Sequence, residues 1–258
     1  MELGIAGRKA VVLAATRGMG FAIARSLVQE GVDVTIVGRN PVGVRDAVQR
    51  LTADAGGNVG GLEVDLSDPD AAKRISQGVG EIDILVNNTP GPPPGPISTV
   101  TGDTWRTQFD GMAARLFEIT SMLLPGMRER RWGRVLTLAS SGAIQPIDNL
   151  GISNTLRAGI VAWSKTLSNE VASSGVTANV LIPGRIRTER LEEIDAANAK
   201  RQGVDVATIE KRSIATIPAG RYGTVEDYAD VATFLVSERA AYITGSTVRC
   251  DGGIIRST

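Results

Sequence analysis

Short apolar runs alternate along this chain with longer stretches in which apolar residues recur at helical spacing. The first run, KAVVLAAT at 9–16, predicts a buried strand, and the stretch 18–30 places Ile23, Leu27 and Val28 on one helix face. The same reasoning predicts further strands at 32–39, 61–66, 82–88, 133–140, 176–182 and 246–253. It predicts further helices at 41–53, from 69 onward, and at 103–130, 152–173 and 224–237.

Two of these helices are preceded by the same local signal, a polar capping residue followed by proline. Asn40 precedes Pro41, and Asp68 precedes Pro69. Asn and Asp side chains accept hydrogen bonds from the free N–H groups of a helix start, and proline suits the first helical position. The two pairs therefore predict where the second and third helices begin.

Strands that alternate with helices indicate βαβ units, which give a parallel sheet covered by helices on both faces. We predict one doubly wound α/β domain of the Rossmann type, with seven parallel strands, spanning 1–258. The proline-rich stretch 88–96, NTPGPPPGP, is too rigid to be a linker between domains. The polar, amphipathic stretch 187–215 is expected to be a mobile lid, although a solvated surface helix also explains it. Ligands of such sheets bind beyond the carboxyl ends of the strands.

Composition narrows the possible functions. Lys+Arg and Asp+Glu balance at 28 each, which argues against a nucleic-acid partner. The chain has no histidine and one cysteine, Cys250, which excludes a disulfide framework, a Cys/His zinc site and a histidine-based triad. We therefore predict no metal site. Apolar runs are too short to span a membrane, and the N-terminus lacks a signal-peptide core. We expect a cytoplasmic protein that acts on a small molecule.

A glycine-rich turn follows the first predicted strand and opens the first predicted helix. It reads LAATRGMGFAIA at 13–24, with Gly18 and Gly20 at the turn. In this context the backbone can approach a pyrophosphate, and the helix N-terminus supplies free N–H groups. Glycines placed only for tight packing explain the turn equally well.

The turn resembles the TGxxxGxG motif of the short-chain dehydrogenase/reductase family, with Leu13 and Ala14 where the motif has Thr and Gly. Other segments resemble elements of the same family over nearly the whole chain: VDL at 64–66, ILVNNT at 84–89, IPGRIRT at 182–188, and the segment 218–253. The resemblance implies a nicotinamide cofactor and oxidoreductase activity. It also implies a homo-oligomer, tetramer or dimer, formed through 103–130, 152–173 and the C-terminal segment.

The choice of nucleotide depends on the end of the second strand. An acid there would bind the ribose 2′-OH of NAD, but this chain has Gly38 followed by Arg39. Arginine is suited to a 2′-phosphate, and Arg17 in the turn is a second candidate. In the family these arginines imply NADPH, which we predict, although Arg39 is also explained as a solvated strand-end residue. By resemblance, Asp65 and Leu66 flank the adenine, Asn87 lies against the ribose and Thr188 reaches the nicotinamide end. The full expected set is Thr16, Arg17, Gly18, Met19, Gly20, Arg39, Asp65, Leu66, Asn87, Gly184, Ile186 and Thr188.

Carbonyl reduction needs a proton donor beside the oxygen. In the family this donor is a tyrosine, with a lysine one helical turn later, a serine at a strand end and an asparagine on another helix. Aligning TLRAGIVAWSKTL at 155–167 with the family places Ser153 at the tyrosine and Arg157 at the lysine. Ser140 lies thirteen residues before Ser153, which is the family's spacing for the serine, and aligning Trp105 and Phe117 places Met112 at the asparagine. The resemblance therefore implies an atypical member that lacks the tyrosine and the lysine.

The remaining polar residues can still form a site. Ser153 and Arg157 are four residues apart, hence on one helix face, and Ser140 would face them from a strand end. Together they could stabilise negative charge on a substrate oxygen. Each residue also has a structural explanation. Ser153 can be a helix-start serine, Arg157 a structural or ribose-contacting cation, and Ser140 a strand-end hydroxyl. The tyrosines all lie in the C-terminal segment, and Tyr242 in the YITG turn is expected to pack.

Three functions stay open. The first is an atypical NADPH-dependent reductase that transfers hydride to a small-molecule carbonyl or conjugated enone. The second is a non-catalytic NADPH-binding partner subunit or sensor. The third is a non-redox isomerase or dehydratase on the same fold, because a fold does not determine a function.

Overall fold

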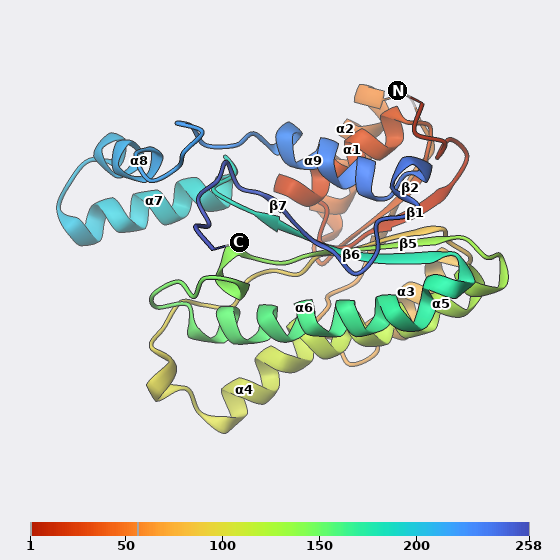
Figure 1. The fold of residues 1–258 in the computed structure, drawn as a ribbon, viewed down its shortest axis with the longest axis horizontal. Helices are drawn as coiled ribbons and strands as arrows, with labels where there is room; N and C mark the ends of the chain where they lie inside the picture. Colours follow the sequence, from red (N-terminus) through yellow and green to blue (C-terminus); the bar gives the residue numbers. More distant parts are fainter. Residues whose placement is uncertain (1, 56, 258) are drawn as a thin grey trace.

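A computed structural model describes residues 2–55 and 57–257, so Met1, Gly56 and Thr258 of the predicted domain lie outside the described residues. Its centre is a seven-stranded parallel sheet with the order β3-β2-β1-β4-β5-β6-β7 (Figure 1). The strands are β1 Lys9–Val12, β2 Asp33–Gly38, β3 Val59–Glu63, β4 Ile84–Asn87, β5 Gly133–Leu138, β6 Val176–Pro183 and β7 Thr247–Cys250. This order confirms the doubly wound fold and puts its switch point between β1 and β4.

Helices cover both faces of the sheet (Figure 1). One layer holds α1 Gly18–Gln29, α2 Pro41–Ala55 and α9 Val225–Leu235, and the other holds α3 Ala71–Val79, α5 Arg115–Glu129 and α6 Gly151–Val171. Successive strand residues point to opposite faces, so Ala10 and Val12 pack in the first layer and Val11 in the second. Burial on both faces explains why the strands read as continuous apolar runs.

The two predicted helix starts behave differently. Asn40 caps α2 as expected, because its Oδ1 accepts hydrogen bonds from two N–H groups of the first turn. The prediction for Asp68 is wrong, since α3 begins at Ala71. The Asp68 carboxylate instead accepts the Asp70 N–H at 3.1 Å and pairs with Arg74 at 3.1 Å. Asp68 therefore stabilises a turn that precedes the helix.

The predicted helix at 103–130 is not continuous. It begins as α4, Gly102–Phe109, passes through a π-helical turn at Asp110–Ala114 and continues as α5. Met112 is buried in that turn, packed with Ile152 and Leu156 of α6. Such turns recur at functional sites, and here one lies against the start of α6.

The predicted lid forms two helices, α7 Glu189–Gln202 and α8 Val206–Ile214, at one end of the molecule beyond the sheet (Figure 1). Gly203 separates them in the left-handed conformation, with φ of 64°. The hydroxyl of Thr188 caps α7, and the carboxylate of Asp205 caps α8. Short 3₁₀ turns complete the fold at Ile97–Thr99, Ser141–Ala143, Ala172–Ser174 and Glu238–Ala240. Among the described helices, none has the length and apolar character needed to cross a membrane.

Candidate active site

The glycine-rich turn connects β1 to α1 at the switch point of the sheet. Ala14 has φ of 48° and Gly18 has φ of 61°, so the chain turns sharply before the helix. Arg17 is the residue before α1, and within the described chain no side chain caps that end of the helix. The first turn of α1 also contains no acid. The N–H groups and the positive end of the helix dipole are therefore available to an anion.

Glycine is needed at Gly18 and at Gly20 for two different physical reasons. A Cβ on Gly20 would lie 2.8 Å from the Ala14 carbonyl oxygen and 3.1 Å from Nδ2 of Asn88, so only glycine fits there. Nδ2 of Asn88 also donates to the Ala14 carbonyl at 3.2 Å. Gly20 thus serves packing, whereas Gly18 serves the turn. Asn88 holds the loop and was not among the predicted residues, although its place in the NNT stretch was visible.

At the end of β2, Thr16 explains why the last residue of the strand is Gly38 and not an acid. A Cβ on Gly38 would lie 2.5 Å from Cγ2 of Thr16, which leaves no room for a side chain. Arg39 is exposed immediately after it. Beyond β3, the N–H of Ser67 at 2.9 Å and its hydroxyl at 2.8 Å lower the pKa of Asp65, and the charge of Arg39 acts in the same direction. The structure thus gathers Thr16, Arg39 and Asp65 at one corner.

Two residues expected at the cofactor are buried instead. Asn87 is 0% exposed, and its Nδ2 donates to Oγ1 of Thr120 at 3.0 Å. It occupies the last position of β4, where the sheet and α5 cover it, so its side chain does not face a ribose. Leu66 is 8% exposed, and the Arg115 guanidinium donates to its carbonyl at 3.3 Å. Leu66 therefore presents little surface to an adenine.

The turn after β6 comes close to the glycine-rich turn between β1 and α1, which we call the phosphate loop. A Cβ on Gly184 would lie 2.6 Å from Cα of Asp251, so glycine lets this turn pass the C-terminal segment. Ile186 is 6% exposed and therefore offers mainly its backbone. Thr188 caps α7, and its Cγ2 would lie 3.8 Å from a Cβ on Gly18. The starts of α1 and α7 are thus neighbours, as expected if both contact one cofactor.

The two candidate catalytic serines lie in adjoining segments. Ser140 follows β5, half-buried, and its Oγ accepts the Gly142 N–H at 3.2 Å. Ser153 is half-buried in the first turn of α6. A Cβ on Gly142 would overlap Oδ1 of Asn154 and lie 3.5 Å from Oγ of Ser140, so the strand end touches the helix start. Asn154, not predicted, also donates to the Ile147 carbonyl at 2.9 Å and holds the intervening loop.

Arg157 is buried, and main-chain carbonyl groups hold its guanidinium in place. It is 6% exposed, with Nη1 donating to the Leu138 carbonyl at 2.7 Å and Nη2 to the Thr89 carbonyl at 2.9 Å. Burial lowers its pKa to about 10. The guanidinium links the ends of β4 and β5 from inside the fold. The expectation that it reaches a substrate oxygen is therefore not met by this placement.

Two of the three tyrosine hydroxyls already have hydrogen-bond partners inside the fold. The Tyr222 hydroxyl donates to Asp195 at 2.8 Å, and the Tyr228 hydroxyl donates to the Leu181 carbonyl at 2.9 Å. Both side chains are buried, and burial raises the pKa of each. Tyr242 is fully exposed, so the predicted packing role is wrong for the chain as described.

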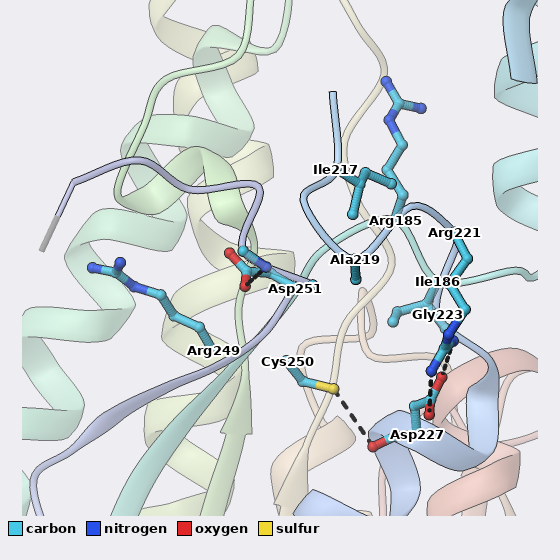
Figure 2. Close-up of a pocket in the computed structure, with 12 residues that line it drawn as sticks. Arg185, Ile186, Ile217, Ala219, Arg221, Gly223, Asp227, Arg249, Cys250 and Asp251 are labelled. Atoms are coloured by element: carbon cyan, nitrogen blue, oxygen red, sulfur yellow. Dashed lines mark hydrogen bonds and ion pairs between the residues drawn. The ribbon is translucent and has the colours of Figure 1, made fainter. Parts of the chain in front are cut away.

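A cavity of about 410 Å³ lies beside the carboxyl ends of β6 and β7, between Ile186, Ile217 and Cys250 (Figure 2). Two of the charged residues that line the cavity are already paired with each other. Arg221 binds Asp227 through two hydrogen bonds of 2.6 and 3.0 Å, and Figure 2 shows Arg249 directed away from Cys250. Within residues 2–55 and 57–257, no cluster of acidic and cysteine side chains is suited to a metal ion.

The fold and the phosphate loop define a class of protein, the parallel α/β domains with a nucleotide site at the switch point. A family model described as enoyl-(acyl carrier protein) reductase matches residues 13–255. The 3-oxoacyl-[acyl-carrier-protein] reductase FabG of Salmonella typhimurium is 31% identical over 254 residues, which is 96% of this chain and 97% of the relative. The chain therefore belongs to the short-chain dehydrogenase/reductase family.

Solved structures agree closely with the fold. The L-sorbose reductase from Gluconobacter frateurii, crystallised with NADPH and L-sorbose, superposes with a TM-score of 0.95 at 29% identity and covers 100% of both chains. YwfH, described as an NADPH-dependent reductase involved in bacilysin biosynthesis, superposes with a TM-score of 0.91 at 27% identity, covering 98% of this chain and 100% of that one.

Proposed function

We propose that this protein is an NADPH-dependent oxidoreductase that reduces a carbonyl or conjugated enone of a small molecule without a tyrosine acid. The observation that carries the proposal is the start of α1, which no side chain caps among the described residues. Arg17 lies beside this helix start, and Arg39 directly follows β2. The family membership and the NADPH named for two similar structures support it.

The chain's residues fit this cofactor. The turn at Gly18 and the open α1 start would hold the pyrophosphate, and Arg17 and Arg39 would meet the 2′-phosphate. Thr188 lies next to Gly18 and would contact the nicotinamide half. When bound, NADPH supplies a hydride.

The two serines would act on the substrate oxygen. Ser140 and Ser153 are both half-buried, so their hydroxyls can donate to an oxygen on which negative charge develops. A serine hydroxyl is a poor acid, so the proton comes from water or from a hydroxyl of the substrate. An enone suits such a site better than a ketone, because the enolate oxygen needs donors more than an adjacent acid. Arg157 would act as a positioning residue by fixing the ends of β4 and β5.

A second candidate function is a non-catalytic NADPH-binding partner or sensor. The observation that favours it is the commitment of the Arg157 guanidinium to two main-chain carbonyls. We also propose a homo-oligomer, because Phe109 and Met122 on α4 and α5 are 45% and 49% exposed. Light scattering after size-exclusion chromatography measures its mass.

The test is a titration with NADPH and NADH, followed by absorbance of the reduced cofactor with ketones, quinones and cyclic enones. Turnover is expected with NADPH, and Ser140→Ala and Ser153→Ala are each expected to lower kcat by about 10²-fold. Thr155→Ala, exposed on α6, is the matched control. NADPH binding without turnover on any compound favours the partner or sensor function, and absence of nucleotide binding refutes both.

A further inference from the structure

An ion pair joins the phosphate loop to the lid. Nη1 of Arg17, before the start of α1, lies 2.6 Å from Oε2 of Glu189, the first residue of α7. The same nitrogen lies 3.9 Å from Oε1 of Glu193, one turn further along α7. The two acids share one helix face, so the lid presents a pair of carboxylates to Arg17. The contact spans 172 residues of sequence.

Glu189 is the main partner in this arrangement. Glu193 is also 3.3 Å from Arg190 of its own helix, so its charge is shared. The start of α7 is held beside the loop by packing as well, because Cγ2 of Thr188 would lie 3.8 Å from a Cβ on Gly18. An acid in the first turn suits the dipole of α7, but that effect requires no partner on α1.

We propose that Glu189 lowers the preference for NADPH over NADH by competing with the cofactor 2′-phosphate for Arg17. The inference rests on the proposed function, in which Arg17 meets that phosphate. A phosphate group carries up to about two negative charges and three acceptor oxygens, so it displaces a single carboxylate from a guanidinium. NADH lacks the group and leaves the ion pair in place. Binding of NADPH therefore breaks the ion pair between Arg17 and Glu189, and binding of NADH does not.

The exposure of the ion pair determines how much the loss of Glu189 is expected to change NADPH binding. The side chains of Arg17 and Glu189 are 60% and 67% exposed, so water screens their attraction. Breaking an exposed pair of this kind changes a binding equilibrium by about twofold to fivefold. Glu189→Gln keeps the side-chain shape but removes the charge. It is expected to tighten NADPH binding by that factor, to leave NADH binding unchanged and to lose most of its effect at high salt.

The experiment measures the Kd of NADPH and of NADH by tryptophan fluorescence for four proteins. They are the wild type, Glu189→Gln, Arg17→Met and the double variant. Glu192→Gln is the matched control, because Glu192 is exposed in the same first turn of α7. The gain from Glu189→Gln is expected to disappear in the Arg17→Met background, since the competition acts only through Arg17.

Each outcome has one meaning. Tighter NADPH binding in Glu189→Gln, unchanged NADH binding and no gain without Arg17 support the proposal. A gain equal to that of Glu192→Gln, a gain that persists without Arg17, or no gain overturns it while the proposed function stands. Failure of the wild type and Glu189→Gln to bind NADPH at all overturns both.

Discussion

Arg157→Met tests the interpretation of Arg157 as a clamp between strand ends. Methionine retains most of the apolar stem but removes the guanidinium that donates to the Leu138 and Thr89 carbonyls. Both bonds lie inside the fold, since Arg157 is 6% exposed. The substitution therefore leaves two buried acceptors without their donors and separates a loss of hydrogen bonding from a loss of packing.

The magnitude follows from those two bonds. A hydrogen bond from a charged donor contributes about 1.5–3 kcal/mol net, so two contribute about 3–6 kcal/mol. Burial opposes this gain, because it disfavours the charged guanidinium and lowers the pKa of Arg157 to about 10. This penalty acts at every pH below about 10 and is relieved only as the pH rises above that value. We therefore expect the lower end, a loss of about 3 kcal/mol in the free energy of unfolding.

Equilibrium urea unfolding at neutral pH measures this loss, with the slope m checked for constancy. The matched control is Arg45→Met on α2, where the arginine is exposed and surface changes stay within about 0.5 kcal/mol. Arg157→Lys keeps the charge but not the planar fork, so an intermediate loss is expected. A loss below about 1 kcal/mol for Arg157→Met would refute the clamp, because that is less than one buried charged hydrogen bond.

Three further substitutions are expected to change cofactor binding or stability. Gly20→Ala places a Cβ 2.8 Å from the Ala14 carbonyl oxygen, so it is expected to weaken NADPH binding at least tenfold and to lower stability by about 1–3 kcal/mol, measured by titration and urea unfolding. Ala14→Gly relieves a left-handed φ of 48° and is expected to raise the unfolding free energy by up to about 1 kcal/mol; a lower value contradicts strain at Ala14. The hydrogen bonds from Arg221 and from the Thr224 N–H lower the pKa of Asp227, so its stabilisation is fully present above the ordinary carboxyl pKa and is lost progressively as the pH falls from there to the lowered value. The stability deficit of Asp227→Asn against the wild type is therefore expected to shrink below about pH 4, and a constant deficit contradicts the pKa direction.

The alternation of strands and helices was predictable because burial on both sheet faces produces apolar runs that differ in period from helices. The start of α2 was predictable because an Asn–Pro pair acts within one turn. Asp68 was not, because its carboxylate binds Arg74, and a six-residue contact competes with the local capping signal. Local chemistry therefore predicts element boundaries only where no longer contact competes for the same side chain.

In the candidate site, too, the sequence does not predict the longer contacts that a side chain makes. Alignment to a family assigns a residue to a position, but it does not say whether the side chain points outward. Arg157 is long enough to reach past the helix to two carbonyls, and Asn87 turns inward to Thr120, so both leave the surface that a ligand would use. Gly38 illustrates the converse: a missing acid is explained as much by Thr16, which leaves no room for a Cβ, as by cofactor choice. The preference for NADPH must therefore be tested at Arg17 and Glu189, where charges are free to exchange partners, rather than inferred from Gly38.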